Sequence, residues 1–189
     1  MSRLARLPLA CLLALAAVVA AGCGGEPHDV RTQGETEGLY IEVDELTYQI
    51  QMSRILEPAS REDQGYLRGL AEGIEPTAEE VWFAIFLRVQ NQTDETHRSA
   101  DRFEIVDTTN KTYRPVGLDL RSNVFAYRPA EVSPGTVIPE PDSPSFNGPI
   151  QGDLILFKVQ VRSLYNRPLQ FRISSTRGTG TTGIIDIDV

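Results

Sequence analysis

Short runs in which apolar and polar residues alternate fill the chain from Leu39 to its last residue. In the first run, for example, Leu39, Ile41 and Val43 are separated by Tyr40 and Glu42. Such alternation is typical of strands that bury one face. The runs that predict strands are 39–50, 81–89, 103–107, 112–116, 154–161, 169–173 and 185–189. About seven short strands separated by turns predict an all-β fold, an antiparallel β-sandwich.

The run at 81–89 differs from the others because it is apolar on both faces as far as Arg88. This is the pattern of a central strand whose two faces are both covered. The runs at 103–107 and 112–116 flank a polar turn and predict a hairpin. Pro115 confines the second arm of this hairpin to a sheet edge or a strand end, because proline has no backbone N–H to donate.

Two segments interrupt the alternation. Ser60, followed three residues later by Asp63, has the spacing of a capping box and predicts a short helical insertion at 60–72. The proline-rich segment 117–149 is too long for a plain turn, and structureless loops of that length are uncommon unless they serve a function. We therefore expect what is particular to this protein to lie in these two segments.

The N-terminal region has the three parts of a secretory signal peptide. Residues 1–6 carry two arginines and no acid, residues 7–21 are apolar apart from Pro8, and small residues lead to Cys23. The apolar run is shorter than the ~20 residues that a membrane-spanning helix needs. The sequence therefore predicts export from the cytoplasm.

Residues 20–23, Ala-Ala-Gly-Cys, resemble the bacterial lipobox. This resemblance implies that the Cys23 thiol receives a diacylglycerol, that the chain is cleaved just before it, and that palmitate or a similar acyl chain anchors the protein. Ordinary cleavage near an unmodified Cys23 is the alternative. The only other cysteine, Cys11, leaves with the signal peptide. The mature chain is therefore expected to form no disulfide.

The expected organisation has three parts: a signal peptide at 1–22, the lipidated cysteine and a flexible tether at 23–38, and one folded domain at 39–189. The tether is rich in glycine and charged residues and cannot bury enough apolar surface to fold. Removing residues 1–22 takes away two of the 18 basic residues and none of the 26 acids, which leaves a net charge of about −10. So acidic a domain excludes nucleic acid as a partner, and the membrane contact falls to the lipid. We expect a cell-membrane location outside the cytoplasm, in the outer membrane if the host has one.

The second half of the chain resembles a known family. Its apolar strand runs into Val-Gln-Asn-Gln-Thr at 89–93, and a proline- and glycine-containing segment leads to Gly152, Asp153 and the strand with Phe157. This order is similar to the telokin-like, immunoglobulin-type domain of unknown function found in bacterial lipoproteins. The resemblance implies an immunoglobulin-like β-sandwich over roughly 38–189. It implies a fold and not a site.

Reactive side chains are few. The domain contains a single histidine, His97, which we interpret as an exposed polar residue, and the mature chain a single methionine. The sequence therefore predicts no metal site, no cofactor and no catalytic group. Two alternatives depend on its many acids: an envelope hydrolase with paired carboxylates from the region 101–119, or a calcium-stabilised adhesion domain.

Aromatic residues and arginines gather in the proline-rich segment, and such residues dominate protein interfaces. The possible partner-binding residues are Phe125, Tyr127, Arg128 and Phe146. The aromatic residues could instead cover the open ends of the sandwich. The preferred hypothesis is a non-enzymatic binding or scaffolding domain that contacts an envelope protein or a wall component.

Lipidation of Cys23 is directly testable. Cys23→Ala should abolish incorporation of an alkyne-labelled palmitate and release the protein from the membrane fraction, because two or more acyl chains hold a protein stably on a bilayer. Cys11→Ala is the matched control and should stay labelled. Equal labelling of both variants would show that Cys23 is not the modified residue.

Overall fold

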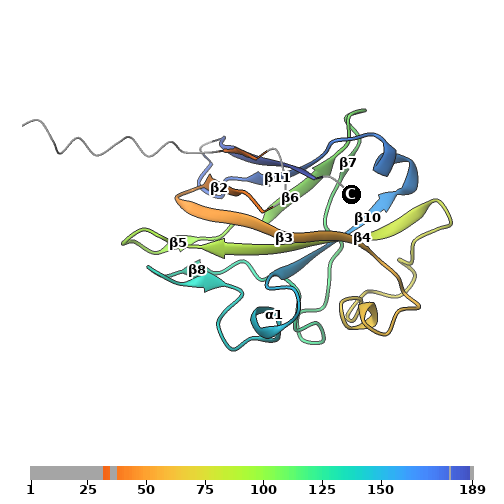
Figure 1. Ribbon diagram of the computed structural model, residues 1–189, viewed down its shortest axis with the longest axis horizontal. Coiled ribbons are helices and arrows are strands. Elements are labelled where there is room, and N and C mark those ends of the chain that lie inside the picture. Colours follow the sequence, from red (N-terminus) through yellow and green to blue (C-terminus); the bar gives the residue numbers. More distant parts are fainter. Residues whose placement is uncertain (1–31, 35–37, 179, 188–189) are drawn as a thin grey trace, which may run out of the picture.

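The computed structural model describes residues 32–34, 38–178 and 180–187. These residues form an almost entirely β structure (Figure 1). Its strands are β1 (Gln33–Gly34), β2 (Tyr40–Val43), β3 (Leu46–Leu56), β4 (Glu80–Gln90), β5 (His97–Arg98), β6 (Arg102–Val106), β7 (Thr112–Tyr113), β8 (Glu131–Val132), β9 (Val137–Ile138), β10 (Asp153–Gln160), β11 (Leu169–Ser174) and β12 (Thr182–Ile187). Its helices are short: η2 (Asp63–Gly65), α1 (Pro144–Asn147) and η3 (Val161–Tyr165).

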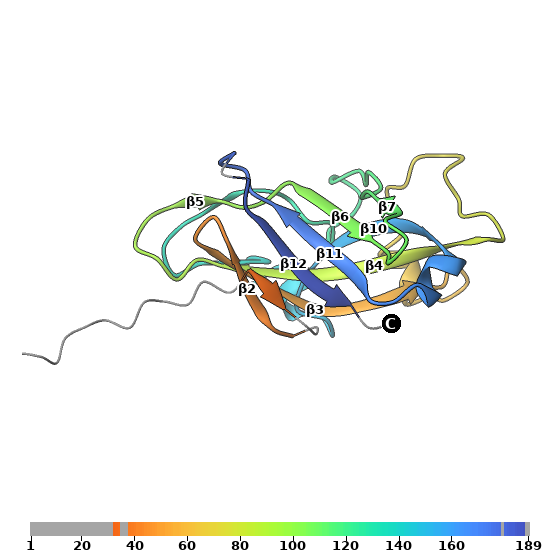
Figure 2. The same cartoon turned by 90° about the horizontal axis from the view of Figure 1, so that it is seen from above.

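Two sheets pack face to face. Sheet A has the strand order β1-β12-β11-β6-β7, and sheet B has the order β10-β4-β3-β2, with β9 paired to the end of β4. The pairs are antiparallel except for β1 with β12. Seen from above, the strands of sheet A cross obliquely over those of sheet B (Figure 2). The prediction of an all-β, antiparallel β-sandwich is confirmed, and β7 with Pro115 beside it lies at a sheet edge as expected.

The main core lies between the sheets. Phe103 on β6 stacks on Phe171 on β11 with ring centroids 5.6 Å apart, and Phe157 on β10 meets Phe171 edge-on at 6.2 Å. The inner face of β4 contributes residues of one parity: Phe83, Ile85, Leu87 and Val89. Burial of these apolar side chains is the principal stabilising contribution.

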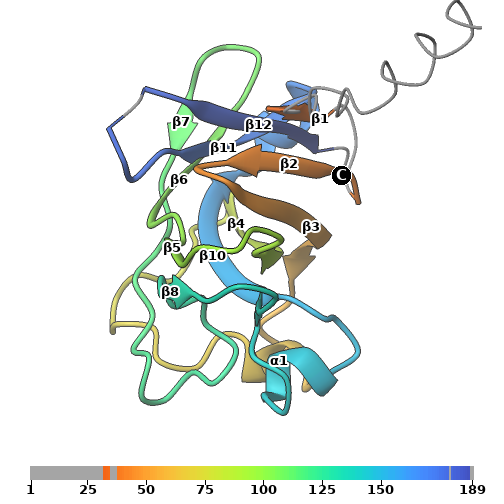
Figure 3. The same ribbon diagram turned by 90° about the vertical axis from the view of Figure 1, so that its left-hand side faces the viewer.

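A second core covers the outer face of sheet B. It holds the other parity of β4, Trp82, Ala84 and Phe86, together with Leu154 and Leu156 of β10. The segments 57–75 and 116–126 pack over these residues as a third layer, visible with α1 on the side of sheet B away from sheet A (Figure 3). The prediction that the strand at 81–89 is covered on both faces is confirmed.

The insertion at 60–72 is less helical than predicted. It contains only η2, a single 3-10 turn that includes Asp63. The reason is that the Asp63 carboxylate does not cap the turn from within; it accepts hydrogen bonds from the Arg54 guanidinium and from the backbone N–H of Glu57, at 2.8 Å for the latter. Gly69 then turns the chain with φ of 77°, close to the backbone of Asp119. The acid that suggested a helix therefore fastens the insertion to β3.

The proline-rich segment is ordered rather than a plain loop, since it contains β8, β9 and α1. Part of it covers the free edge of β10. Tyr127 N donates to Leu154 O at 2.9 Å, and Leu154 N donates to Phe125 O at 2.7 Å. The sheet edge is therefore paired, which removes a template for aggregation.

Gly152, at the start of β10, is required by close packing. A Cβ at this position would lie 2.8 Å from the Phe86 carbonyl carbon and 3.0 Å from the Leu87 nitrogen. Gly152→Ala should therefore lower the free energy of unfolding by about 1–3 kcal/mol, as overpacking does. Urea unfolding of the purified proteins measures this change. Gly117→Ala is the control, since nothing lies within 4 Å of its added Cβ; an equal loss in both variants would refute the packing explanation.

Candidate functional site: a cleft beside Asp153

A cleft of about 410 Å³ opens between the start of β10 and the proline-rich segment. Its lining residues are Val124, Ala126, Arg128, Ala130, Ile138, Pro139, Glu140, Ser143, Pro144 and Asp153. The walls are mainly aliphatic, and the ionisable lining residues are Arg128, Glu140 and Asp153. This is the composition of small recognition sites in proteins.

Register places Asp153 at the floor of this cleft. Asp153 pairs with Leu87 of β4 and has the parity of Ile155 and Phe157, whose side chains face the main core. It is the first residue of β10, so its carboxyl lies where the core ends and the cleft begins. Gly152, packed on the backbone of β4, fixes this start of the strand.

The opposite wall comes from the chain around α1. Ile138 is buried in the main core and anchors the wall there. Ser143 caps α1, its Oγ accepting a hydrogen bond from Phe146 N at 3.2 Å. Ser145, inside α1, is fully buried next to Asp153. The cleft is therefore built on elements that are packed against the core.

The Asp153 carboxyl has unusual electrostatics. Burial raises its pKa to about 6, and the negative charge of Glu140 acts in the same direction. The nearby Ser145 hydroxyl and the positive charge of Arg128 oppose the increase. Burial raises a carboxyl pKa because it disfavours the charged form. A carboxyl perturbed in this way within a cleft marks a candidate functional site.

Arg128 does not neutralise Asp153 by direct contact. Its guanidinium donates to the Leu120 carbonyl oxygen, and the side chain is exposed. Among the ion pairs of the described residues, none joins Arg128 to Asp153. The carboxylate at the floor of the cleft is thus left with incomplete charge compensation.

The structure places the predicted partner-binding residues in different environments, and two of them are largely covered. Tyr127 is 8% exposed and belongs to the main core, where its hydroxyl donates to Ala100 O at 2.9 Å. Phe125 is half-buried and packs on Tyr66 in the second core. These two aromatic rings fill cores and do not form an open surface, because the proline-rich segment is itself part of the third layer.

The other predicted residues have different environments. Arg128 lines the cleft, as described above. Phe146 is half-buried beneath the Arg88 guanidinium, 6.0 Å from its ring centroid. Cys23 lies outside the described residues.

The acids at 101–119 are engaged separately. Asp107 lies inside the β6–β7 turn, where its Oδ1 accepts from Thr109 N at 2.9 Å and Lys111 N at 3.0 Å. Asp119 accepts from Ser122 Oγ at 2.7 Å in a turn of its own. Asp101 lines a smaller apolar cleft of about 190 Å³ in which it is the only carboxylate among the lining residues that the structure describes. The predicted carboxylate pair is therefore not assembled in this region.

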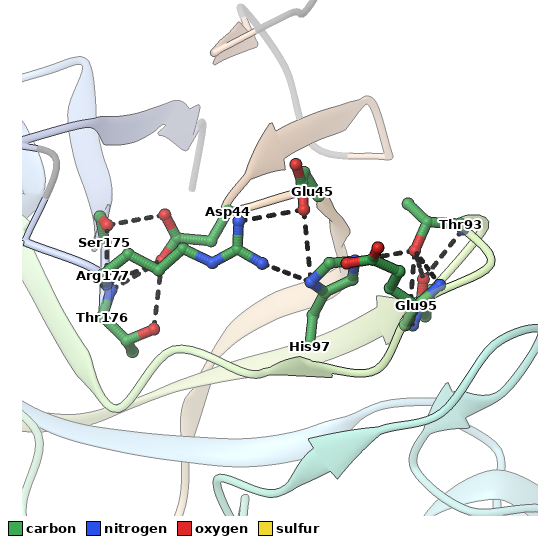
Figure 4. A network of polar contacts seen from close by, with 9 residues as sticks. Asp44, Glu45, Thr93, Glu95, His97, Ser175, Thr176 and Arg177 are labelled. Atoms are coloured by element: carbon green, nitrogen blue, oxygen red, sulfur yellow. Dashed lines mark hydrogen bonds and ion pairs between the residues drawn. The ribbon is translucent and has the colours of Figure 1, made fainter.

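His97 is not the exposed residue expected from the sequence. It is 3% exposed and contacts three side chains from three loops (Figure 4). Its Nδ1 accepts from the Arg177 guanidinium and lies 3.3 Å from Glu45 Oε2, while its Nε2 lies 2.8 Å from Thr93 Oγ1. This arrangement assigns the tautomer with hydrogen on Nε2.

The same network fastens the β11–β12 loop. Asp44 accepts from Ser175 Oγ at 2.6 Å and from Thr176 N at 2.7 Å, and these bonds hold its pKa low against the opposing effect of burial. Arg177 completes the connection through Glu45 at 3.0 Å. Since each polar group has a partner within the protein, we assign this network to holding one end of the sandwich together. In the described part of the chain, no three His, Cys, Asp or Glu side chains gather where they could hold a metal ion.

Sequence reasoning missed Asp153. The available signal was parity: an acid occupies the first core-facing position of an otherwise apolar strand. An acid at such a position is either paired or functional.

Comparisons with known proteins concern the fold. No protein-family model matches the chain, and no curated protein matches it. The Bacillus subtilis protein yjhA has 6% identity over 82% of this chain and 99% of its own, with a TM-score of 0.47. A candidate lipoprotein of Bacillus subtilis has 10% identity over 82% of this chain and 39% of its own, with a TM-score of 0.49. An uncharacterised β-sandwich protein of Clostridium difficile has 11% identity over 85% of this chain and 99% of its own, with a TM-score of 0.42.

These likenesses carry no activity over to this chain. The fold and the cleft define it as an all-β sandwich protein with an acid-floored cleft on its surface. In the part of the chain that the structure describes, no helix has the length and apolar character needed to cross a membrane.

The raised pKa of Asp153 predicts a pH-dependent effect on stability. The usual carboxyl pKa is 3.8, so the folded state binds this proton more tightly and stability falls as pH rises from about 4 to about 6. At pH 7.5 the free energy of unfolding of Asp153→Asn should therefore exceed that of the wild type by about 1–2 kcal/mol after allowing for partial exposure. The variant should accordingly unfold at a higher urea concentration. At pH 4 the difference should vanish. Asp101→Asn, at an exposed acid, is the control; a pH-independent difference for Asp153→Asn would contradict the burial explanation.

Proposed function

We propose that the protein is a lipid-anchored, non-enzymatic binding domain outside the cytoplasm, and that the cleft beside Asp153 receives part of an envelope protein. The lipobox-like residues before Cys23 support the anchoring and the location. The immunoglobulin-type resemblance supports a display scaffold, in which a rigid sandwich carries a recognition surface formed by loops.

One observation carries the binding proposal: an exposed apolar side chain lines a cleft that has a half-buried carboxyl at its floor. Val124 lines the cleft and is 53% exposed. Leu120, whose carbonyl oxygen accepts from the Arg128 guanidinium, lines the neighbouring cleft beside Asp101 and is 41% exposed. Exposed apolar residues grouped around a concave site with polar anchors are typical of interaction sites. Isolated exposed apolar residues would carry no such meaning.

A second candidate function is favoured by one specific feature. Asp153, with its raised pKa, and Glu140 line the same cleft, and two carboxylates in different environments are the machinery of glycoside hydrolases. We prefer binding because the lining is mainly aliphatic and, among the residues that the structure describes, includes no aromatic ring or amide side chain to hold a sugar. Hydrolysis of purified cell-wall glycan, lost in both Asp153→Asn and Glu140→Gln, would establish the enzyme instead.

Site-specific photocross-linking in living cells tests the binding proposal. A photoreactive phenylalanine analogue at Val124 should yield one recurrent adduct with an envelope protein, identified by mass spectrometry. The same analogue at Tyr165, which is 81% exposed but distant in the sequence and absent from the cleft, is the matched control. Scattered products at Val124, or the same adduct from both positions, would rule out the cleft as the interface.

A further inference from the structure

The cleft has the charge and shape of a receptor for a single cationic side chain. Two carboxylates line it from separate segments, Asp153 at the start of β10 and Glu140 after β9. Arg128, the only basic residue among the described lining residues, donates to Leu120 O and makes no ion pair with Asp153. Even partial burial of a carboxylate without a directly paired cation is unfavourable. A ligand cation would supply the missing charge.

The walls restrict what that cation can be attached to. Val124, Ala126, Ile138 and Pro139 form an aliphatic lining that leads to the carboxylates. An alkyl stem would pack along this lining while its charged end reaches the floor, as lysine side chains do elsewhere. A compact ammonium carries three donors and no acceptor, which matches carboxylates that only accept.

We infer that the cleft binds an alkylammonium group, the side chain of a lysine on a protein partner, with the half-buried Asp153 as its counter-ion and Glu140 as a second carboxylate. This inference rests on the proposed binding function and names the chemistry of its ligand. A protein is favoured over a wall peptide because Val124, which lines the cleft, is 53% exposed and offers apolar surface that a protein partner would cover. The net charge of −8 for the whole chain also draws basic partners toward it.

The first test uses a small probe, n-butylammonium, titrated into the full chain and followed by NMR at the Asp153 carboxyl carbon. We expect saturable shifts at Asp153, while 1-butanol, which has the same stem without the charge, causes none. Asp153→Asn should weaken binding by at least about tenfold, as loss of a charge-assisted contact does. Asp101→Asn is the matched control and should leave binding unchanged. Equal shifts from butanol, or unchanged binding by Asp153→Asn, would overturn the inference.

The pH dependence gives an independent readout. Butylammonium stays charged between pH 5 and 7.5, so any change in affinity over this range reports on the protein. Binding should weaken as pH falls through about 6, where Asp153 gains its proton. The groups that face this carboxyl are Arg128, Glu140, Ser145 and Tyr127. Glu140→Gln should lower affinity and move the pH midpoint downward, because loss of the Glu140 charge lowers the pKa of Asp153. Asp153→Asn should abolish the pH dependence; a pH dependence that persists in Asp153→Asn would assign the titration to another group.

Cross-linking from Val124 separates this inference from the proposed function. If Asp153→Asn removes the Val124 adduct and the adduct maps beside a partner lysine, the binding function and the recognition of an ammonium group are both supported. If the adduct survives Asp153→Asn at full yield, the binding function stands and ammonium recognition is overturned. If only wall peptide is captured at Val124, the protein lysine is overturned as the source of the ammonium group.

Discussion

The rest of the structure depends on β4 being apolar on both faces. Phe83, Ile85 and Leu87 meet sheet A, while Trp82 and Phe86 point to the opposite side. A two-layer sandwich would leave that second face in water, at a cost of about 25 cal/mol per Å² of apolar surface. A third layer is therefore obligatory, and the two segments that interrupt the strand pattern provide it. Both segments are irregular because each must cross the sheet and still find hydrogen-bond partners for its own backbone N–H and C=O groups.

The cleft beside Asp153 lies where the third layer meets the edge of sheet B. The proline-rich segment reaches the edge of β10, pairs with it at Leu154, and then leaves it to form the wall around α1. Where it leaves the edge, the first residue of β10 is no longer covered, and that residue is Asp153. The cleft thus arises at the point where the covering chain and the sheet part. The path of the proline-rich segment therefore has two consequences: it covers the second core, and it leaves the cleft beside Asp153 open.

Much of the fold could be predicted from local sequence, because alternation reports directly on which face of a strand is buried. It located the main strands, the hairpin and the doubly covered β4. It did not locate contacts between distant residues. Asp63 has the spacing of a helix cap, yet its partner is Arg54 on another element. From the sequence alone, Tyr127 and His97 are expected at the surface. In the structure both are buried, because Ala100 O accepts from the Tyr127 hydroxyl and Arg177 donates to the His97 ring. Partners distant in sequence decide whether a polar residue is buried.

The same distinction separates the two polar regions of this molecule. His97 and Asp44 are buried or half-buried, but hydrogen bonds and ion pairs from neighbouring loops compensate each of them, so they hold structure and need no ligand. Asp153 lies near the Ser145 hydroxyl, and Arg128, whose charge also acts on it, donates its hydrogen bond to Leu120 O. Local rules of burial and pairing are broken at functional sites more often than elsewhere. An asparagine at position 153 would fit the same space without the charge, so stability alone does not account for the acid. Its charge, in a cleft lined mainly by aliphatic residues and without an ion pair to Arg128, is the feature that a cationic ligand would explain.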